Sequence, residues 1–374
     1  MSPNLDNQTE GSGDEGDLAS HRTIRGGGWS TRLIAFFLSA LLCVVAAEVT
    51  ARAFWRLWYG VPFLHPDRIL YAYYPELRRV DTERPTHGDE FYDILLLGAS
   101  TLNRDWGRVE QELLEQLADH GHRNVRIFNL AQAAHTSRDS WLKYAALGEA
   151  RFGLVVVYDG INEARANNAP PEIFREDYSH YSWYQIVNAL APYHGTAYFA
   201  LPYTLRYLAI NMQYVLAKDR YVPTHCPRQD WVRYGRESRS AVSFKHNLGA
   251  ILDLAARRGD RVLLMTFATY VPEDYVPDHS LEICKAKNFD PASRLIIPLE
   301  IWGAREDVLK TVAIQNEIIR GFAAEHEGVL FVDQAHLMPG ARQYFNDPCH
   351  FTAVGSAKFV ESLLVGLLPS LKSG

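Results

Sequence analysis

The chain has 374 residues, 47% of them apolar and 22% charged, which is enough to bury a large core in one or two domains. Its formal net charge of -6 argues against a nucleic-acid partner, because no region supplies the basic surface that phosphate neutralisation requires. Four cysteines without Cys-x-x-Cys or His/Cys zinc spacing predict no metal site and leave the pairing of Cys226, Cys284 and Cys349 open.

The amino-terminal region differs in composition from the rest of the chain. Residues 1–26 are rich in Asn, Gly, Ser, Asp and Glu and are predicted to form a disordered tail. Residues 27–58 are predicted to be a signal anchor, because arginines precede fifteen uncharged residues, 33–47. The positive-inside rule then keeps the amino terminus in the cytoplasm and places the remainder outside it, in the periplasm or the extracellular space.

Two other interpretations of the apolar segment remain open. Val45-Ala46-Ala47 is an acceptable cleavage site for a signal peptide, and fifteen residues is short for a full membrane span. The segment could also be a buried core helix. Glu48 would be costly inside a span unless it lies at the interface or pairs with Arg52.

After a Pro- and Tyr-rich lead-in over 59–90, short apolar runs alternate with helical patterns from residue 91 to the end. Either Ser137 or Asp139 is expected to cap one of the helices. The alternation predicts an α/β domain over 91–374, with a three-layer, flavodoxin-like, parallel five-stranded sheet. Strands are predicted at 93–97, 125–129, 154–158, 262–267 and 329–332, and helices at 109–117, 137–150, 306–325 and 353–368.

Residues from about 167 to 240 differ from the rest of the domain. They lack the strand-helix alternation and contain nine tyrosines between Tyr178 and Tyr221. We predict a mostly helical, aromatic-rich insertion after the third strand. Its tyrosines are most simply core residues, and their functional alternative is a stacking platform for sugar rings.

Polar segments follow the predicted strands at the edge of the sheet where ligands bind in open α/β folds. Ser100 follows Gly98-Ala99 at the end of the first strand, and residues 129–137 follow the second. Residues 159–163 follow the third strand, and residues 347–352 lie directly before the last helix. Each segment alone has a simple alternative interpretation as a turn or a helix cap.

Together these segments supply the groups that acyl transfer needs. A serine hydroxyl becomes a nucleophile when an imidazole takes its proton, and a carboxylate orients that imidazole. Ser100, His350 and Asp347 provide these three groups, with Asp347 three residues from the histidine. The Asn162 amide is a candidate donor to the oxyanion.

The order and spacing of these segments resemble the SGNH hydrolases, also called GDSL esterases and lipases. Four motifs carry the resemblance: Gly98-Ala99-Ser100, Asn129 to Ala134, Gly160-Ile161-Asn162-Glu163, and Asp347-Pro348-Cys349-His350. Ala99 and Glu163 stand where the family often has aspartate, and Ala134 stands where glycine is usual. The resemblance covers roughly 91–369, and the amino-terminal anchor resembles membrane-anchored members.

The resemblance implies that Ser100 is the nucleophile, His350 the base and Asp347 its orienter. It also implies an oxyanion hole formed by the N–H groups of Ser100 and Ala134 and by the Asn162 side chain. His135 and Glu163 are weaker candidates for residues that line the substrate. If the family glycine relies on positive φ, alanine at 134 is strained there.

The resulting hypothesis is an exported, membrane-anchored serine esterase without cofactor or metal. Its substrate is expected to be an acyl ester, with O-acetyl groups on a polysaccharide as the first candidate. An O-acetyltransferase that uses the same acyl-enzyme is one alternative. A catalytically silent glycan-binding or assembly protein on the same fold is the other, motivated by Ala134 and the aromatic insertion.

Overall fold

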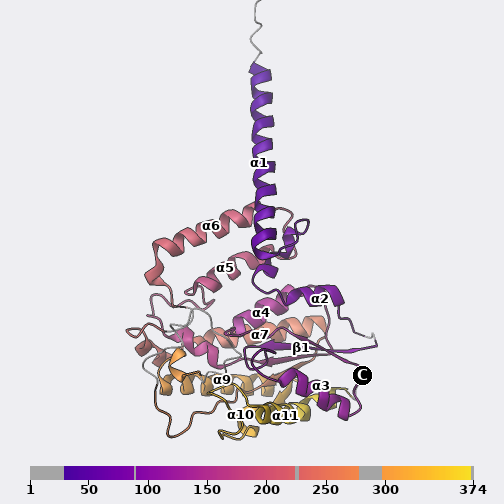
Figure 1. Ribbon diagram of the computed structural model, residues 1–374, viewed down its shortest axis with the longest axis vertical. Coiled ribbons are helices and arrows are strands. Elements are labelled where there is room, and N and C mark those ends of the chain that lie inside the picture. The colour runs from indigo at the N-terminus through magenta and orange to yellow at the C-terminus, as the bar shows by residue number, and fades with distance from the viewer. Residues whose placement is uncertain (1–28, 88–89, 224–226, 278–296, 372–374) are drawn as a thin grey trace, which may run out of the picture. The chain divides into compact units, whose positions relative to one another are not determined.

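The computed structural model describes residues 29–87, 90–223, 227–277 and 297–371 (Figure 1). The tail predicted over 1–26, as well as Cys226 and Cys284, lies outside the described residues. The chain forms two compact units, Met1–Ala47 and Glu48–Gly374. The boundary falls inside one helix, α1 (Trp29–Tyr59), so the last twelve residues of that helix belong to the second unit.

Five parallel strands form one sheet with the order β2-β1-β3-β4-β5. This order confirms the predicted flavodoxin-like α/β fold. The strands are β1 (Tyr92–Gly98), β2 (Val125–Asn129), β3 (Leu154–Tyr158), β4 (Val262–Met265) and β5 (Leu330–Val332). The fourth strand ends at Met265, two residues earlier than predicted, although the Thr266 N–H still donates to the Val332 carbonyl of β5.

Alternate residues of the central strands pack on opposite faces of the sheet, which is why their sequences are continuously apolar. Ile94 and Leu96 of β1 join one core cluster, whereas Leu95 and Leu97 join the other. The first face is covered by α3 (Val109–Asp119) and α11 (Ala353–Leu371). The second face is covered by α2 (Leu77–Glu83), α4 (Ser137–Ala146) and α7 (Ser240–Arg258), and α9 (Arg305–Glu325) packs beside α7 (Figure 1).

The predicted cap of α4 needs a correction. The N-cap is Thr136, whose hydroxyl accepts from Arg138 N–H, while Asp139 accepts from the Thr136 N–H to complete a capping box. Ser137 is the first helical residue, and the helix ends at Ala146 instead of about Ala150. The long helix α7, which carries the chain from the insertion to β4, is not among the helices predicted from the sequence.

The insertion after β3 is helical and rich in buried aromatic side chains, as predicted. Its α-helices are α5 (Ser182–Leu190) and α6 (Leu201–Leu216). Between β3 and α7 there are also short helical turns: η2 (Ile161–Asn167), η3 (Ala191–Tyr193), η4 (Lys218–Arg220) and η5 (Val232–Glu237). Other short helices of the domain are η1 (Pro66–Ala72), η7 (Leu299–Ile301) and α10 (Gln334–Leu337).

The end of α1 packs against the insertion and the lead-in. Trp55 is buried, and its indole N–H donates to the Thr204 hydroxyl at 2.8 Å. Glu48 forms an ion pair with Arg52 at 2.6 Å and accepts the N–H groups of Ala200 and Leu201. The charge of Glu48 is therefore balanced by a partner four residues along the same helix.

Two described helices, α1 and α11, are long and apolar enough to cross a membrane. Helix α11 is half buried, and its side chains form part of the core beside α3. The side chains of α1 before Glu48 are exposed, with Leu33 at 52% and Leu42 at 74%. The alternative of a buried core helix therefore does not fit this segment.

Candidate active site

The end of β1 delivers Ser100 into a tight turn. Leu102 and Asn103 donate their N–H groups back to the carbonyls of Ala99 and Ser100. A side chain at Gly98 would place its Cβ 2.6 Å from the Tyr158 carbonyl of β3, so the strand can approach its neighbour this closely only with glycine. The close packing of β1 against β3 therefore explains the glycine in the first motif. This packing also sets the position of Ser100 at the end of β1.

Ser100, His350 and Asp347 form a continuous chain of hydrogen bonds. His350 Nε2 lies 2.7 Å from Ser100 Oγ, and His350 Nδ1 lies 2.7 Å from Asp347 Oδ2. The other carboxylate oxygen of Asp347 accepts the N–H groups of Cys349 and His350, both at 2.9 Å. The carboxylate is thus held by its own loop and can orient the imidazole.

Neighbouring elements fix the loop that carries the histidine. The carbonyl of Pro348 accepts from the hydroxyl of Thr269, at 2.7 Å, and from the N–H of Tyr270. The indole of Trp106 stacks on the imidazole of His350, with ring centroids 4.5 Å apart. Because the ring is stacked on one face and hydrogen-bonded at both nitrogens, its orientation is set before a substrate arrives.

The amide of Asn162 is oriented by three partners. Its oxygen accepts from the indole N–H of Trp302 at 2.9 Å and from the guanidinium of Arg165 at 3.2 Å. Its nitrogen donates one proton to the His135 carbonyl at 2.8 Å. Among the described residues, no second group accepts from this nitrogen, so its other proton can point to an oxyanion.

The backbone of Ala134 has φ of +66°, the left-handed conformation that favours glycine. The backbone strain expected for alanine at position 134, where the family usually has glycine, is therefore present. Within the part of the chain that the structure describes, neither Ala134 N–H nor Ser100 N–H donates to another group. Both donors predicted for the oxyanion hole are consequently unused in this conformation.

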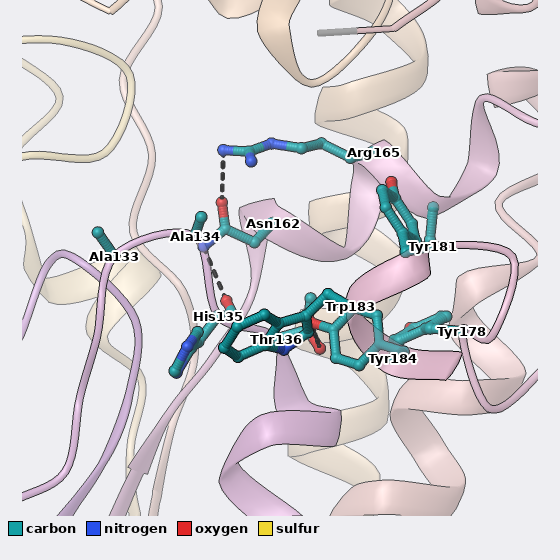
Figure 2. A pocket seen from close by; sticks show the side chains of 11 residues that line it. Ala133, Ala134, His135, Thr136, Asn162, Arg165, Tyr178, Tyr181, Trp183 and Tyr184 are labelled. Atoms are coloured by element: carbon teal, nitrogen blue, oxygen red, sulfur yellow. Dashed lines mark hydrogen bonds between the residues drawn. The ribbon is translucent and has the colours of Figure 1, made fainter. Parts of the chain in front are cut away.

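A pocket of about 230 Å³ opens beside Ala134 (Figure 2). Its lining includes Ala134 and Asn162, two of the three residues predicted for the oxyanion hole, but not Ser100. Figure 2 shows Tyr178, Tyr181 and Tyr184 gathered across the pocket from Ala133 and Ala134. Its lining comprises Ala133, Ala134, His135, Thr136, Asn162, Arg165, Ala166, Tyr178, Tyr181, Trp183 and Tyr184.

The two weaker candidates for substrate contact have different positions. His135 lines the pocket, and burial lowers the pKa of its imidazole to about 3, so the ring is neutral at physiological pH. Glu163 does not line it: the carboxylate is fully buried and accepts the Ser137 N–H at 2.6 Å. Glu163 therefore supports the start of α4 from inside the core.

Two carboxyl groups behind the site have strongly raised pKa values. Burial raises the pKa of Glu163 to about 8 and the pKa of Asp159 to about 7. Asp139, also buried, instead accepts hydrogen bonds from Tyr74, Trp183 and Tyr184. This one carboxylate joins the lead-in, the motif loop and the insertion that forms the pocket wall.

Asp347, Cys349 and His350 also have ligand atoms within 4.8 Å of one another, a grouping that could hold a metal ion. Both imidazole nitrogens are already engaged, by Asp347 and by Ser100. Burial raises the pKa of the Cys349 thiol well above its usual range, whereas a metal takes the thiolate. The donor set therefore fits a hydrogen-bonded triad better than a metal centre.

The structure joins the three residues predicted for the triad by hydrogen bonds, and it places Ala134 and Asn162 together in the lining of one pocket. Sequence reasoning did not find Trp106, Trp302 or Arg165, which hold the imidazole and the amide in place. Trp106 and Arg165 lie in turns after strands β1 and β3, but Trp302 lies 140 positions from Asn162. No spacing signal connects residues so distant in the chain.

The sequence matches no protein-family profile and no curated protein. Its structure is similar to that of a GDSL-like lipase from Bacteroides thetaiotaomicron, with 13% identity, a TM-score of 0.40, and coverage of 80% of this chain and 98% of that chain. It is also similar to an acetylxylan esterase from Geobacillus stearothermophilus, with 12% identity, a TM-score of 0.39, and coverage of 74% and 94%.

Proposed function

We propose that this chain is a serine esterase that cleaves acyl esters through an acyl-enzyme on Ser100. The observation that carries the proposal is the unbroken chain from Ser100 Oγ through His350 to Asp347, with both bonds at 2.7 Å. The N–H groups of Ser100 and Ala134 and the second amide proton of Asn162 support the proposal, because they are free to donate to an oxyanion. An esterase needs these two features together.

In the proposed mechanism, Ser100 Oγ attacks the ester carbonyl while His350 Nε2 takes the hydroxyl proton. The carbonyl oxygen becomes the oxyanion and receives the three donors. His350 then gives its proton to the departing alcohol oxygen, which leaves Ser100 acylated. Water attacks the acyl group, again with proton transfer to His350, and the free serine and a carboxylic acid are released.

We further propose that the substrate is an O-acetylated glycan outside the cytoplasm, reached by an enzyme anchored through α1. Support for the anchor is the exposed apolar stretch of α1, whose Leu33 to Ala47 carry no charge. Support for a sugar is the pocket wall, where Tyr181, Trp183 and Tyr184 offer aromatic surface beside the oxyanion hole.

The same acyl-enzyme serves an O-acetyltransferase if a sugar hydroxyl replaces water in the second half of the reaction. The largely apolar, aromatic wall of the pocket favours this as the second candidate, because it can hold an acceptor and limit water. Product analysis with an acetyl donor separates the two, since transfer yields an acetylated sugar and hydrolysis yields acetate.

The first test compares the protein with its Ser100→Ala variant for p-nitrophenyl acetate hydrolysis and for labelling by a fluorophosphonate probe. We expect the variant to lose on the order of 10⁴- to 10⁶-fold in kcat and all labelling. The matched control is Ser362→Ala on α11, which removes a buried hydroxyl whose one hydrogen bond among the described residues is to the Lys358 carbonyl of its own helix.

A folded parent protein that neither labels nor hydrolyses, with or without a sugar acceptor, would contradict the esterase and the transferase alike. The glycan-binding alternative would then lead, and retention of glycan binding by the Ser100→Ala variant would support it.

A further inference from the structure

Helix α6 turns its more aliphatic face to the outside. Its outward side chains include Leu208, exposed by 49%, Met212 by 66% and Val215 by 74%. The face that packs on the domain buries Tyr203, Thr204 and Ile210. A surface helix in water normally has the opposite arrangement, with polar residues outward.

Exposed apolar side chains continue this face around the end of α1. Arg52 donates to the carbonyls of Phe63 and Tyr198 at 3.1 and 2.7 Å, which holds both segments against the helix. Phe54 stacks on Trp58 and also contacts Tyr207 of α6, so the patch is continuous. We call it the α6 surface: Leu57, Trp58, Leu64, Tyr198, Phe199, Leu205, Leu208, Met212, Val215 and Leu216.

The α6 surface begins where the apolar stretch of α1 ends. The carboxylate of Glu48 accepts the N–H groups of Ala200 and Leu201, both at 2.8 Å, and so ties the start of α6 to α1. Glu48 directly follows Ala47, the last residue of the uncharged run. The first turn of α6 is therefore fixed at the position along the chain where a membrane span would reach the interface.

We propose that the α6 surface lies in the membrane interface, with the bilayer that holds α1 as its occupant. The inference rests on the proposed anchor. Leucine, methionine and valine side chains of α6 would enter the boundary between headgroups and acyl chains, with Tyr198 at headgroup level. The exposed cations Arg56 and Arg206 fit the anionic headgroups of a lipid surface.

Contact with lipid would also reach the pocket wall. Helix α5 packs on α6, and the Gln185 side chain donates to Gln213 at 3.2 Å. The same helix supplies Trp183 and Tyr184 to the pocket. The membrane would therefore contact the insertion on its outer side, while the substrate binds in the pocket on its inner side.

The test reconstitutes the full chain in lipid nanodiscs with a photo-crosslinking residue, p-benzoylphenylalanine, at one position at a time. The positions on the α6 surface are 205 and 212. The matched control is Val365, an apolar residue on α11 with 70% exposure. Position 37, in the apolar stretch of α1, reports on the anchor itself. We expect lipid adducts at 37, 205 and 212 and none above background at 365.

Adducts at 37 without adducts at 205 or 212 would overturn the inference and leave the anchor intact. Adducts between two copies of the chain at 212 would overturn it in favour of a dimer. No adduct at 37 would contradict the anchor and the inference together. A Leu208→Glu, Met212→Glu double variant provides an independent check, because it should reduce the lipid adduct at 205 to the level of 365.

Discussion

At the scale of single residues, Ala134 combines a required group with an unfavourable backbone. Its N–H is a proposed oxyanion donor, yet its φ of +66° costs an alanine about 1 to 2 kcal/mol. Tyr178, with φ of +60°, lines the same pocket, so two of the four described non-glycine residues with positive φ lie there. Strain of this kind tends to occur at functional sites.

Replacing Ala134 with glycine should therefore relieve strain without removing the donor. We expect Ala134→Gly to raise the free energy of unfolding by up to about 1 kcal/mol, because the added freedom of the unfolded chain offsets part of the gain. Esterase activity should be retained. Urea unfolding measures the first effect. Ala133→Gly, at a neighbouring position without positive φ, should destabilise the protein, and equal effects at both positions would refute the explanation.

Glu163 gives a prediction about pH. Burial raises the pKa of this carboxyl from 4.5 to about 8, so folding favours the protonated form. The stability that the protonated group contributes is complete below pH 4.5 and is lost as the pH rises through about 8. The side chain of the Glu163→Gln variant cannot ionise. Its free energy of unfolding, relative to that of the wild type, should therefore increase by about 1.4 kcal/mol per pH unit between pH 4.5 and about 8.

The measurement is the urea midpoint of both proteins at pH 5.5, 7 and 8.5. The control is Glu149→Gln, whose side chain is 97% exposed and which should change little with pH. A constant difference between Glu163→Gln and the wild type at all three pH values would mean that Glu163 is already ionised in the folded state.

At the scale of secondary-structure elements, the start of α4 connects three distant segments. Asp139 accepts the Thr136 N–H at 2.9 Å, the Tyr74 hydroxyl at 2.8 Å and the Trp183 indole N–H at 3.0 Å. Asp139→Ala would leave these buried donors unpaired, at a cost of about 3 kcal/mol or more. Because Ala134 lies only two residues before the N-cap Thr136, hydrolysis should fall as well.

Thermal unfolding and p-nitrophenyl acetate hydrolysis test this prediction in parallel. Asp253→Ala, at an exposed position on α7, is the control and should stay within about 0.5 kcal/mol of the wild type. If Asp139→Ala were as stable as this control, the carboxylate would not be the junction that the hydrogen bonds indicate.

The elements themselves are largely predictable because the signals are local. Strands β1 and β3 are short unbroken apolar runs, and their ends place Ser100 and Asn162 at one edge of the sheet. The residues that steady the site are not predictable in this way. Trp302 and Asn162 meet only because two loops converge. The sequence indicates Asp139 as a candidate helix cap, but it does not indicate the residues of the lead-in and the insertion that donate hydrogen bonds to Asp139. Apolar periodicity indicates which face is buried but not which side chains meet across it.

At the scale of the whole molecule, the end of α1 is part of the catalytic unit. Trp55 is 1% exposed and bonded to Thr204, and Glu48 caps α6. A chain that begins at Arg56 should therefore be less stable than one that begins at Glu48, by about 3 to 5 kcal/mol for the tryptophan alone. Urea midpoints of the two chains measure the difference. Trp55→Ala in the longer chain should reproduce most of the loss, and equal midpoints would show that the helix end is dispensable.

The separation of the triad along the chain also has a consequence for biosynthesis. Ser100 and His350, the proposed nucleophile and its base, lie 250 positions apart. At roughly 5 to 20 residues per second, Ser100 is made about 10 to 50 seconds before its base. A nascent or prematurely terminated chain therefore carries an unactivated serine. In the proposed mechanism, hydrolysis therefore cannot begin before His350 has been synthesised and the chain has folded.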